Sequence, residues 1–124
     1  MIYGWFPGYY FVELKKYYLN AYKNAENEEM KNECARKLGL VYLLDRIRHL
    51  CVRLQFKQYH YTQMLIKQLF KCLDALEKHE DFFYPYDVKD FSLIVRSSID
   101  GREKIHGDDY DKIIFELKKL VKMF

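Results

Sequence analysis

Three basic residues in the middle of the chain have a spacing that suits phosphate binding. Arg46, His49 and Arg53 stand at positions i, i+3 and i+7, so in a helix their side chains share one face. Lys57 and His60 extend this face if the helix continues beyond its apolar pattern. Guanidinium groups bind phosphate through two parallel hydrogen bonds, so this row can contact successive phosphates. The alternative is a solvated helix face on which the arginine stems cover apolar neighbours.

Tyrosines lie close to these basic residues in the sequence. Tyr42, Tyr59 and Tyr61 are near the row, and tyrosine rings stack on unpaired bases. The combination predicts a surface for RNA or DNA, or for a protein complex that handles them. The predicted nucleic-acid-binding residues are Arg46, His49, Arg53, Lys57 and His60.

Arg53 and His60 also permit a sharper hypothesis. In the segment RLQFKQYH, six residues separate the Arg from the His, and this spacing resembles the ribonuclease motif of the HEPN family of helical-bundle nucleases. The resemblance implies that His60 acts on the ribose 2′-hydroxyl, that Arg53 stabilises the phosphate, and that two subunits build one site. It covers these two residues alone. A polar residue normally follows the Arg in that motif, and here it is Leu54.

Other patterns in the sequence argue against a metal, a cofactor or a further catalytic centre. The four histidines are scattered, and the cysteines Cys34, Cys51 and Cys72 show neither CxxC nor zinc-like spacing. There is no Gly-rich phosphate loop, GxSxG elbow or HExxH motif. The segment GDDYD departs from a calcium loop in its spacing, and helix capping explains it better. We therefore expect a protein that is not an enzyme and that has no cofactor, no metal and no small-molecule substrate.

Aromatic residues are in excess. Twelve Tyr, nine Phe and one Trp are more rings than a small bundle can bury fully, and tyrosine is favoured where one end of the ring is dry and the other wet. These rings either form an exposed patch for a protein partner or wrap the ends of the bundle. The predicted partner-binding residues are Trp5, Phe6, Tyr9, Tyr10, Tyr84 and Tyr86.

The distribution of charge supports an anionic partner more than the net charge does. The 124 residues carry 21 Lys and Arg against 18 Asp and Glu, formally +3. Residues 36–78 hold nine basic against three acidic groups, whereas the flanks are mildly acidic, at about −1 and −2. An odd number of cysteines indicates reduced thiols in a cytosol-like, cytoplasmic compartment. The longest uncharged run, residues 1–12, is too short to span a bilayer.

The elements that must position these residues are helices. Only five Gly and two Pro occur, and apolar residues recur at three- and four-residue steps. The clearest stripe runs from Leu40 to Leu54, and Gly39 lies within the same helix, where we expect it to allow close packing or a bend. Helices are expected over residues 9–24, from Asn27 to a turn around 55–61, over 61–79, from Asp87 or Asp90 to near Gly101, and after Gly107.

Two features of this assignment stay open. Asn27 is a candidate helix cap, but the region around it has no Gly or Pro, so residues 9–55 form either one helix or two. The segment EDFFYPYD around Pro85 is expected to be a loop, and residues 1–8 an irregular segment. The sequence as a whole predicts one all-α domain over residues 1–124, an antiparallel bundle of four to five helices.

The predicted function is that of a non-enzymatic interaction protein. It would present the basic stripe and Tyr-rich edges to RNA, DNA or a nucleoprotein complex. Small helical bundles of this kind occur among phage and mobile-element accessory proteins, including inhibitors of nucleic-acid-guided nucleases, and the analogy is one of class alone. The first alternative is a protein-binding or homo-oligomeric module without nucleic-acid contact. The second is the HEPN-like, metal-independent ribonuclease.

Overall fold

The chain forms helices throughout the ranges that the structure, a computed structural model, describes. These are residues 8–55, 62–99 and 104–124, without the side chain of Tyr9. Within them there is no strand, which confirms the predicted all-α bundle. The six helices are α1 (Gly8–Lys23), α2 (Glu28–Gln55), α3 (Thr62–Glu77), α4 (Glu80–Phe83), α5 (Val88–Ile99) and α6 (Gly107–Val121).

Side-chain caps decide where two of the helices begin. The backbone N–H of Met30 donates to Asn27 Oδ1 at 2.8 Å, so Asn27 caps α2 as predicted. The question of one helix or two over residues 9–55 is thereby answered: the chain turns at 24–27 between α1 and α2. Asp87 caps α5 in the same way, accepting from the N–H of Asp90 at 3.0 Å.

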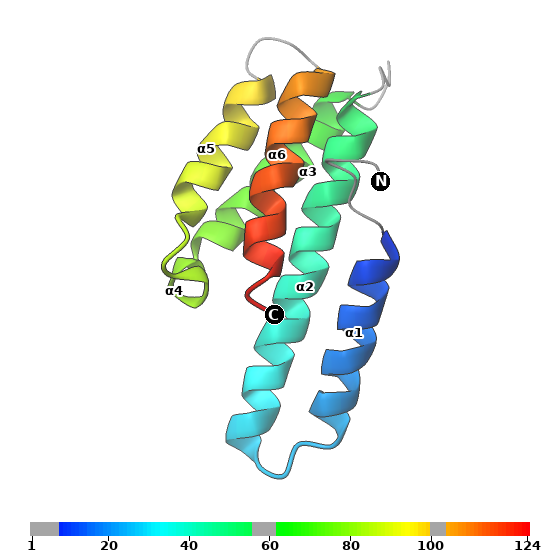
Figure 1. The fold of residues 1–124 in the computed structure, drawn as a ribbon, viewed down its shortest axis with the longest axis vertical. Coiled ribbons are helices and arrows are strands. Elements are labelled where there is room, and N and C mark those ends of the chain that lie inside the picture. The colour runs from blue at the N-terminus through cyan, green and yellow to red at the C-terminus, as the bar shows by residue number, and fades with distance from the viewer. Residues whose placement is uncertain (1–7, 56–61, 100–103) are drawn as a thin grey trace.

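The long helix α2 is the axis of the fold. In Figure 1 it runs the full height of the molecule, with α1 packed along one side and α6 and α3 along the other. The helix α3 also packs on α5, and α5 on α6, so the last four helices gather around one half of α2. A hydrogen bond from the N–H of Ile105 to the Leu54 carbonyl oxygen, 2.9 Å long, holds the start of the last segment against the end of α2.

The core lies between α2 and the helices around it. The apolar stripe predicted on α2 is buried at Leu40, Leu44, Ile47, Cys51 and Leu54, and it belongs to one apolar cluster with the inner faces of α3, α5 and α6. Each of these helices also keeps an exposed polar face. None of the described helices combines the length and the apolar character that crossing a membrane requires.

Two details differ from the prediction. The segment expected to be a loop contains α4, so the described ranges hold six helices rather than four or five. The reason is packing: Phe83 is completely buried, and the helical turn carries it into the core while the ring of Phe82 lies on Phe124. Gly8, expected in the irregular N-terminal segment, is the first residue of α1. The remaining residues of that segment, 1–7, lie outside the described ranges.

Candidate nucleic-acid interface

The predicted stripe on α2 is an exposed surface. Arg46, His49 and Arg53 are all exposed, and the His49 side chain keeps 60% of its accessible area. Tyr42, one turn before Arg46, is 54% exposed and continues the same face. We call Arg46, His49 and Arg53 the basic face. Helical periodicity therefore placed these side chains correctly, on the side of α2 opposite its core stripe.

The acid nearest the basic face, Asp45, pairs with cations outside that face. Asp45 is the one carboxylate in residues 34–73. It lies 2.6 Å from Lys15 Nζ on α1 and 2.9 Å from Arg48 Nη2, and its side chain is 10% exposed. Because Asp45 forms ion pairs with these two cations, its negative charge is neutralised at the α1–α2 contact. Only His49 of the basic face approaches it, with Nε2 at 3.7 Å.

The arginines divide into paired and unpaired groups. Five arginine side chains lie in the described ranges, and three of them form ion pairs: Arg36 with Asp81 at 2.9 Å, Arg48 with Asp45, and Arg96 with Asp74 at 2.7 Å. Arg46 and Arg53 have no carboxylate within ion-pairing distance among these residues. The two unpaired arginines are the two that the sequence assigned to the basic face.

Arg46 is held in place by a neutral group. Its Nη2 donates to Gln68 Oε1 on α3 at 2.8 Å, so the guanidinium is oriented without losing its charge. Lys67 and Lys71, both exposed, lie within one turn of Gln68 on α3. The cationic surface therefore continues from α2 onto the neighbouring helix. The two lysines were not among the predicted site residues, because their relation to Arg46 arises from the packing of α3 on α2.

Part of the predicted site lies outside the described residues. Lys57 and His60 fall in 56–61, so the structure places neither relative to Arg53. Arg53 itself is in the last turn of α2, exposed. Leu54, the residue that departs from the HEPN pattern, is 1% exposed and belongs to the core. The position of Leu54 in the core explains why this residue is apolar and not polar.

The predicted aromatic residues lie in two separate places. Tyr10 is 41% exposed on α1, while Tyr84 and Tyr86, 80% and 39% exposed, lie between α4 and α5. In Figure 1 these elements are on opposite sides of α2. Trp5, Phe6 and the side chain of Tyr9 are outside the described ranges. Of the predicted partner-binding residues with described side chains, Tyr10 therefore lies apart from Tyr84 and Tyr86.

Two thiols and two acids of the described residues have structural environments. Burial raises the pKa of the Cys51 thiol to about 12 and, more weakly, that of Cys72, so both stay protonated at neutral pH. Among the residues with described positions, no three potential ligands come together to hold a metal. Asp108 and Asp109, from the segment GDDYD, lie in the first turn of α6, where acids complement the helix dipole.

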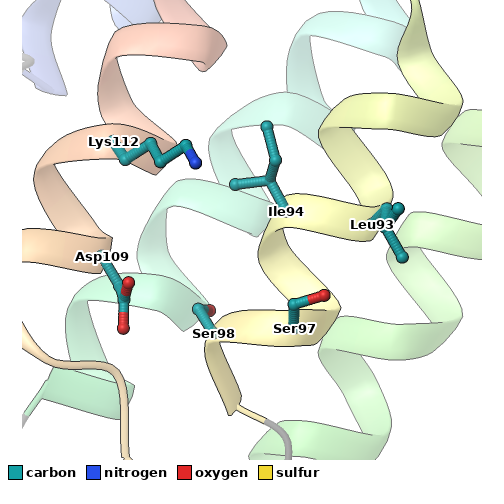
Figure 2. Close-up of a pocket in the computed structure, with 6 residues that line it drawn as sticks. All are labelled: Leu93, Ile94, Ser97, Ser98, Asp109 and Lys112. Carbon is teal, nitrogen blue, oxygen red and sulfur yellow. The ribbon is translucent and has the colours of Figure 1, made fainter.

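Two hollows between pairs of long helices were not predicted. One, of about 350 Å³, opens between α5 and α6, and Figure 2 shows Lys112 extending across it toward Ile94. Its lining mixes apolar and polar side chains: Leu93, Ile94, Ser97, Ser98, Asp109 and Lys112. The other, of about 300 Å³, lies between α1 and α2, lined by Leu19, Tyr22, Ala35, Leu38, Gly39 and Tyr42. The glycine inside the helical pattern was the sequence signal for this second hollow.

Comparison with known proteins adds no assignment. No protein family, curated protein or solved structure matches the chain.

Proposed function

We propose that this protein is a non-enzymatic interaction protein that binds nucleic acid, RNA or DNA, through the basic face of α2. The observation that carries the proposal is the division of the arginines. Arg36, Arg48 and Arg96 are paired with carboxylates, whereas Arg46 and Arg53 are exposed and unpaired within the described ranges. An exposed guanidinium without a carboxylate partner keeps its full charge, and its remaining N–H groups are available for a phosphate contact.

The spacing of these groups suits a polymer of phosphates. Arg46 and Arg53 are seven residues apart, about 10 Å along the helix, so the two contact separate phosphates. Lys67 and Lys71 on α3 widen the cationic surface. Binding of this type releases counterions, and its strength therefore falls with salt. If these four cations each meet one phosphate of a single strand, the log–log slope of affinity against salt is about −3.

Anisotropy of a labelled single-stranded RNA, titrated at about 50 to 300 mM NaCl, tests the proposal. The double variant Arg46→Gln/Arg53→Gln removes two contacts, so the slope should become shallower by about 1.4. The matched control Lys89→Gln/Lys112→Gln removes the same charge from α5 and α6. It should leave the slope near that of the wild type. If both double variants weaken RNA binding equally, net charge alone explains the loss of affinity. That result would contradict the assignment of the binding site to α2.

The same experiment examines the ribonuclease alternative. Under the HEPN resemblance, RNA incubated without a divalent metal would be cleaved, and His60→Ala would abolish cleavage while the protein keeps its helical content. A non-enzymatic binder leaves the RNA intact in both cases. Gel analysis of the titrated RNA therefore separates the two functions directly.

One observation favours a second candidate function, a protein-binding or homo-oligomeric module. Tyr84 is 80% exposed beside a hollow of about 450 Å³ that Tyr86 and Pro85 also line. Exposed tyrosines of this kind are enriched at protein interfaces. Sedimentation velocity tests self-association through this site: a dimer that Tyr84→Ala converts to monomer supports it, and a wild-type monomer at high concentration excludes it.

A further inference from the structure

The hollow between α1 and α2 is apolar and partly aromatic. Its volume is about 300 Å³, its lining is almost wholly apolar, and two of its walls are tyrosines, Tyr22 from α1 and Tyr42 from α2. Leu19, at 42% exposure, forms part of the rim. An apolar, aromatic depression that is open to solvent offers space for a ligand group.

Gly39 keeps this hollow open. It is exposed in the middle of α2, and a Cβ added there would meet no atom within 4 Å. Of the two expected roles of this glycine, close packing or a bend, close packing is not found, since no neighbouring group approaches it. In a helix interior glycine costs about 1 kcal/mol relative to alanine. What the missing side chain provides is the open floor of the hollow.

The hollow and the basic face form one continuous surface. Six residues of α2 follow one another at steps of four, three, four, three and four, and such steps stay on one side of a helix. The first three border the hollow and the last three are the basic face. In order they are Ala35, Gly39, Tyr42, Arg46, His49 and Arg53, all exposed. An apolar site for a ring thus leads directly into a row of phosphate-binding groups.

Cations also stand over the two tyrosines. Lys15 Nζ lies 4.4 Å from the centre of the Tyr42 ring, and Lys31 Nζ lies 5.3 Å from that of Tyr22. Lys15 is paired with Asp45, whereas Lys31 has no carboxylate within ion-pairing distance in the described ranges. An apolar depression with ammonium groups at its edge matches a ligand that joins an aromatic ring to an anionic group.

We propose that this hollow receives one unpaired base of a single-stranded nucleic acid whose phosphates run along the basic face. The inference rests on the proposed function and specifies its substrate as single-stranded. A base offers a flat aromatic ring to Tyr22 and Tyr42, and its strand carries phosphates toward Arg46 and Arg53. In a duplex the bases are stacked inside and none can enter the hollow.

Three probes of equal length test this inference by anisotropy: a single-stranded oligoadenylate, an abasic strand with the same phosphates, and a duplex. One base stacked on aromatic side chains is worth about 1–3 kcal/mol, so the oligoadenylate should bind about tenfold more tightly than the abasic strand. Gly39→Leu fills the hollow. It should remove that tenfold advantage and leave the affinities for the abasic strand and the duplex, and the salt slope, unchanged.

Neither loss of folding nor the mere addition of a leucine should explain the effect of Gly39→Leu. Leucine is a far better helix former than glycine, and its Cβ meets open space, so Gly39→Leu should fold with unchanged helical content and an unchanged or higher melting temperature. Ser97→Leu, at an exposed position of α5, is the matched control that adds a leucine elsewhere. It should bind all three probes as the wild type does.

The outcomes separate this inference from the proposed function. Gly39→Leu and the removal of bases from the probe can both leave the affinity unchanged while Arg46→Gln/Arg53→Gln still weakens binding. In that case the hollow is not a base site, and the proposal that the basic face binds nucleic acid still stands. If no strand binds, but the protein binds phosphatidylserine vesicles and Gly39→Leu abolishes that binding, the hollow serves a lipid surface and both proposals are overturned.

Discussion

Asp45 holds α1 and α2 together through charge, and its replacement by Asn should be among the most damaging conservative changes in this protein. The Asp45 side chain is 10% exposed and receives Lys15 Nζ at 2.6 Å and Arg48 at 2.9 and 3.1 Å. Asn keeps the size and one acceptor oxygen but removes the charge, so both cations lose their counter-ion at once. Arg48, 12% exposed over the Phe11 ring, cannot easily move to water.

The magnitude follows from burial. Removing one member of a fully buried ion pair costs about 3–5 kcal/mol, because the other charge is left uncompensated. Lys15, at 23% exposure, can recover part of its hydration by turning outward, which lowers the cost. We expect Asp45→Asn to reduce the free energy of unfolding by about 2–4 kcal/mol.

Urea unfolding followed by circular dichroism measures this loss. Glu13→Gln, which removes a carboxylate from an exposed position of α1, is the control and should change stability by less than about 0.5 kcal/mol. The loss in Asp45→Asn should also persist at high salt, since buried pairs are screened weakly. A loss no larger than that of the control would show that Asp45 is not the electrostatic link described above.

Three further predictions concern single groups. Gly39→Ala should raise the free energy of unfolding by about 1 kcal/mol and the melting temperature by about 4 °C, because the new methyl group meets open space and improves the helix. Burial raises the pKa of Cys51 from 9.0 to about 12, so the unfolded chain releases this proton first as the pH rises. Stability present below pH 9 should therefore fall by about 2 kcal/mol by pH 10.5, measured by urea unfolding, with a shallower decline in Cys51→Ala. Tyr18→Phe removes the 2.8 Å hydrogen bond that the hydroxyl donates to the Phe124 carbonyl oxygen and should cost about 1 kcal/mol in the same assay.

Each of these has a clear contrary result. A lower melting temperature for Gly39→Ala would mean that the backbone at this position requires glycine. An alkaline decline of the same slope in Cys51→Ala would assign the titration to other groups, among them Tyr18 and Tyr110, whose pKa values burial also raises. Unchanged stability in Tyr18→Phe would show that water replaces the lost hydrogen bond at no cost.

The sequence by itself determined the local structure of this protein. Apolar spacing fixed the buried stripe of α2, and the same periodicity required Arg46, His49 and Arg53 to lie opposite that stripe, where they are found. Asn27 signalled the start of α2 through its capping chemistry. These properties depend on residues within one or two turns of each other, so they can be inferred from the chain alone. Whether Arg53 and His60 form a pair stays a prediction.

The tertiary structure decided which charges remain available. The sequence places Asp45 next to Arg46 and cannot tell which cation it neutralises. Packing of α1 on α2 brings Lys15 to it from thirty positions away, while Arg46 and Arg53 have no carboxylate partner in the described ranges. The hollow beside Gly39 likewise exists only because α1 contributes the residues that line its other side. Both outcomes depend on how helices meet, and a helix's own periodicity shows its faces but not the neighbour that each face will contact.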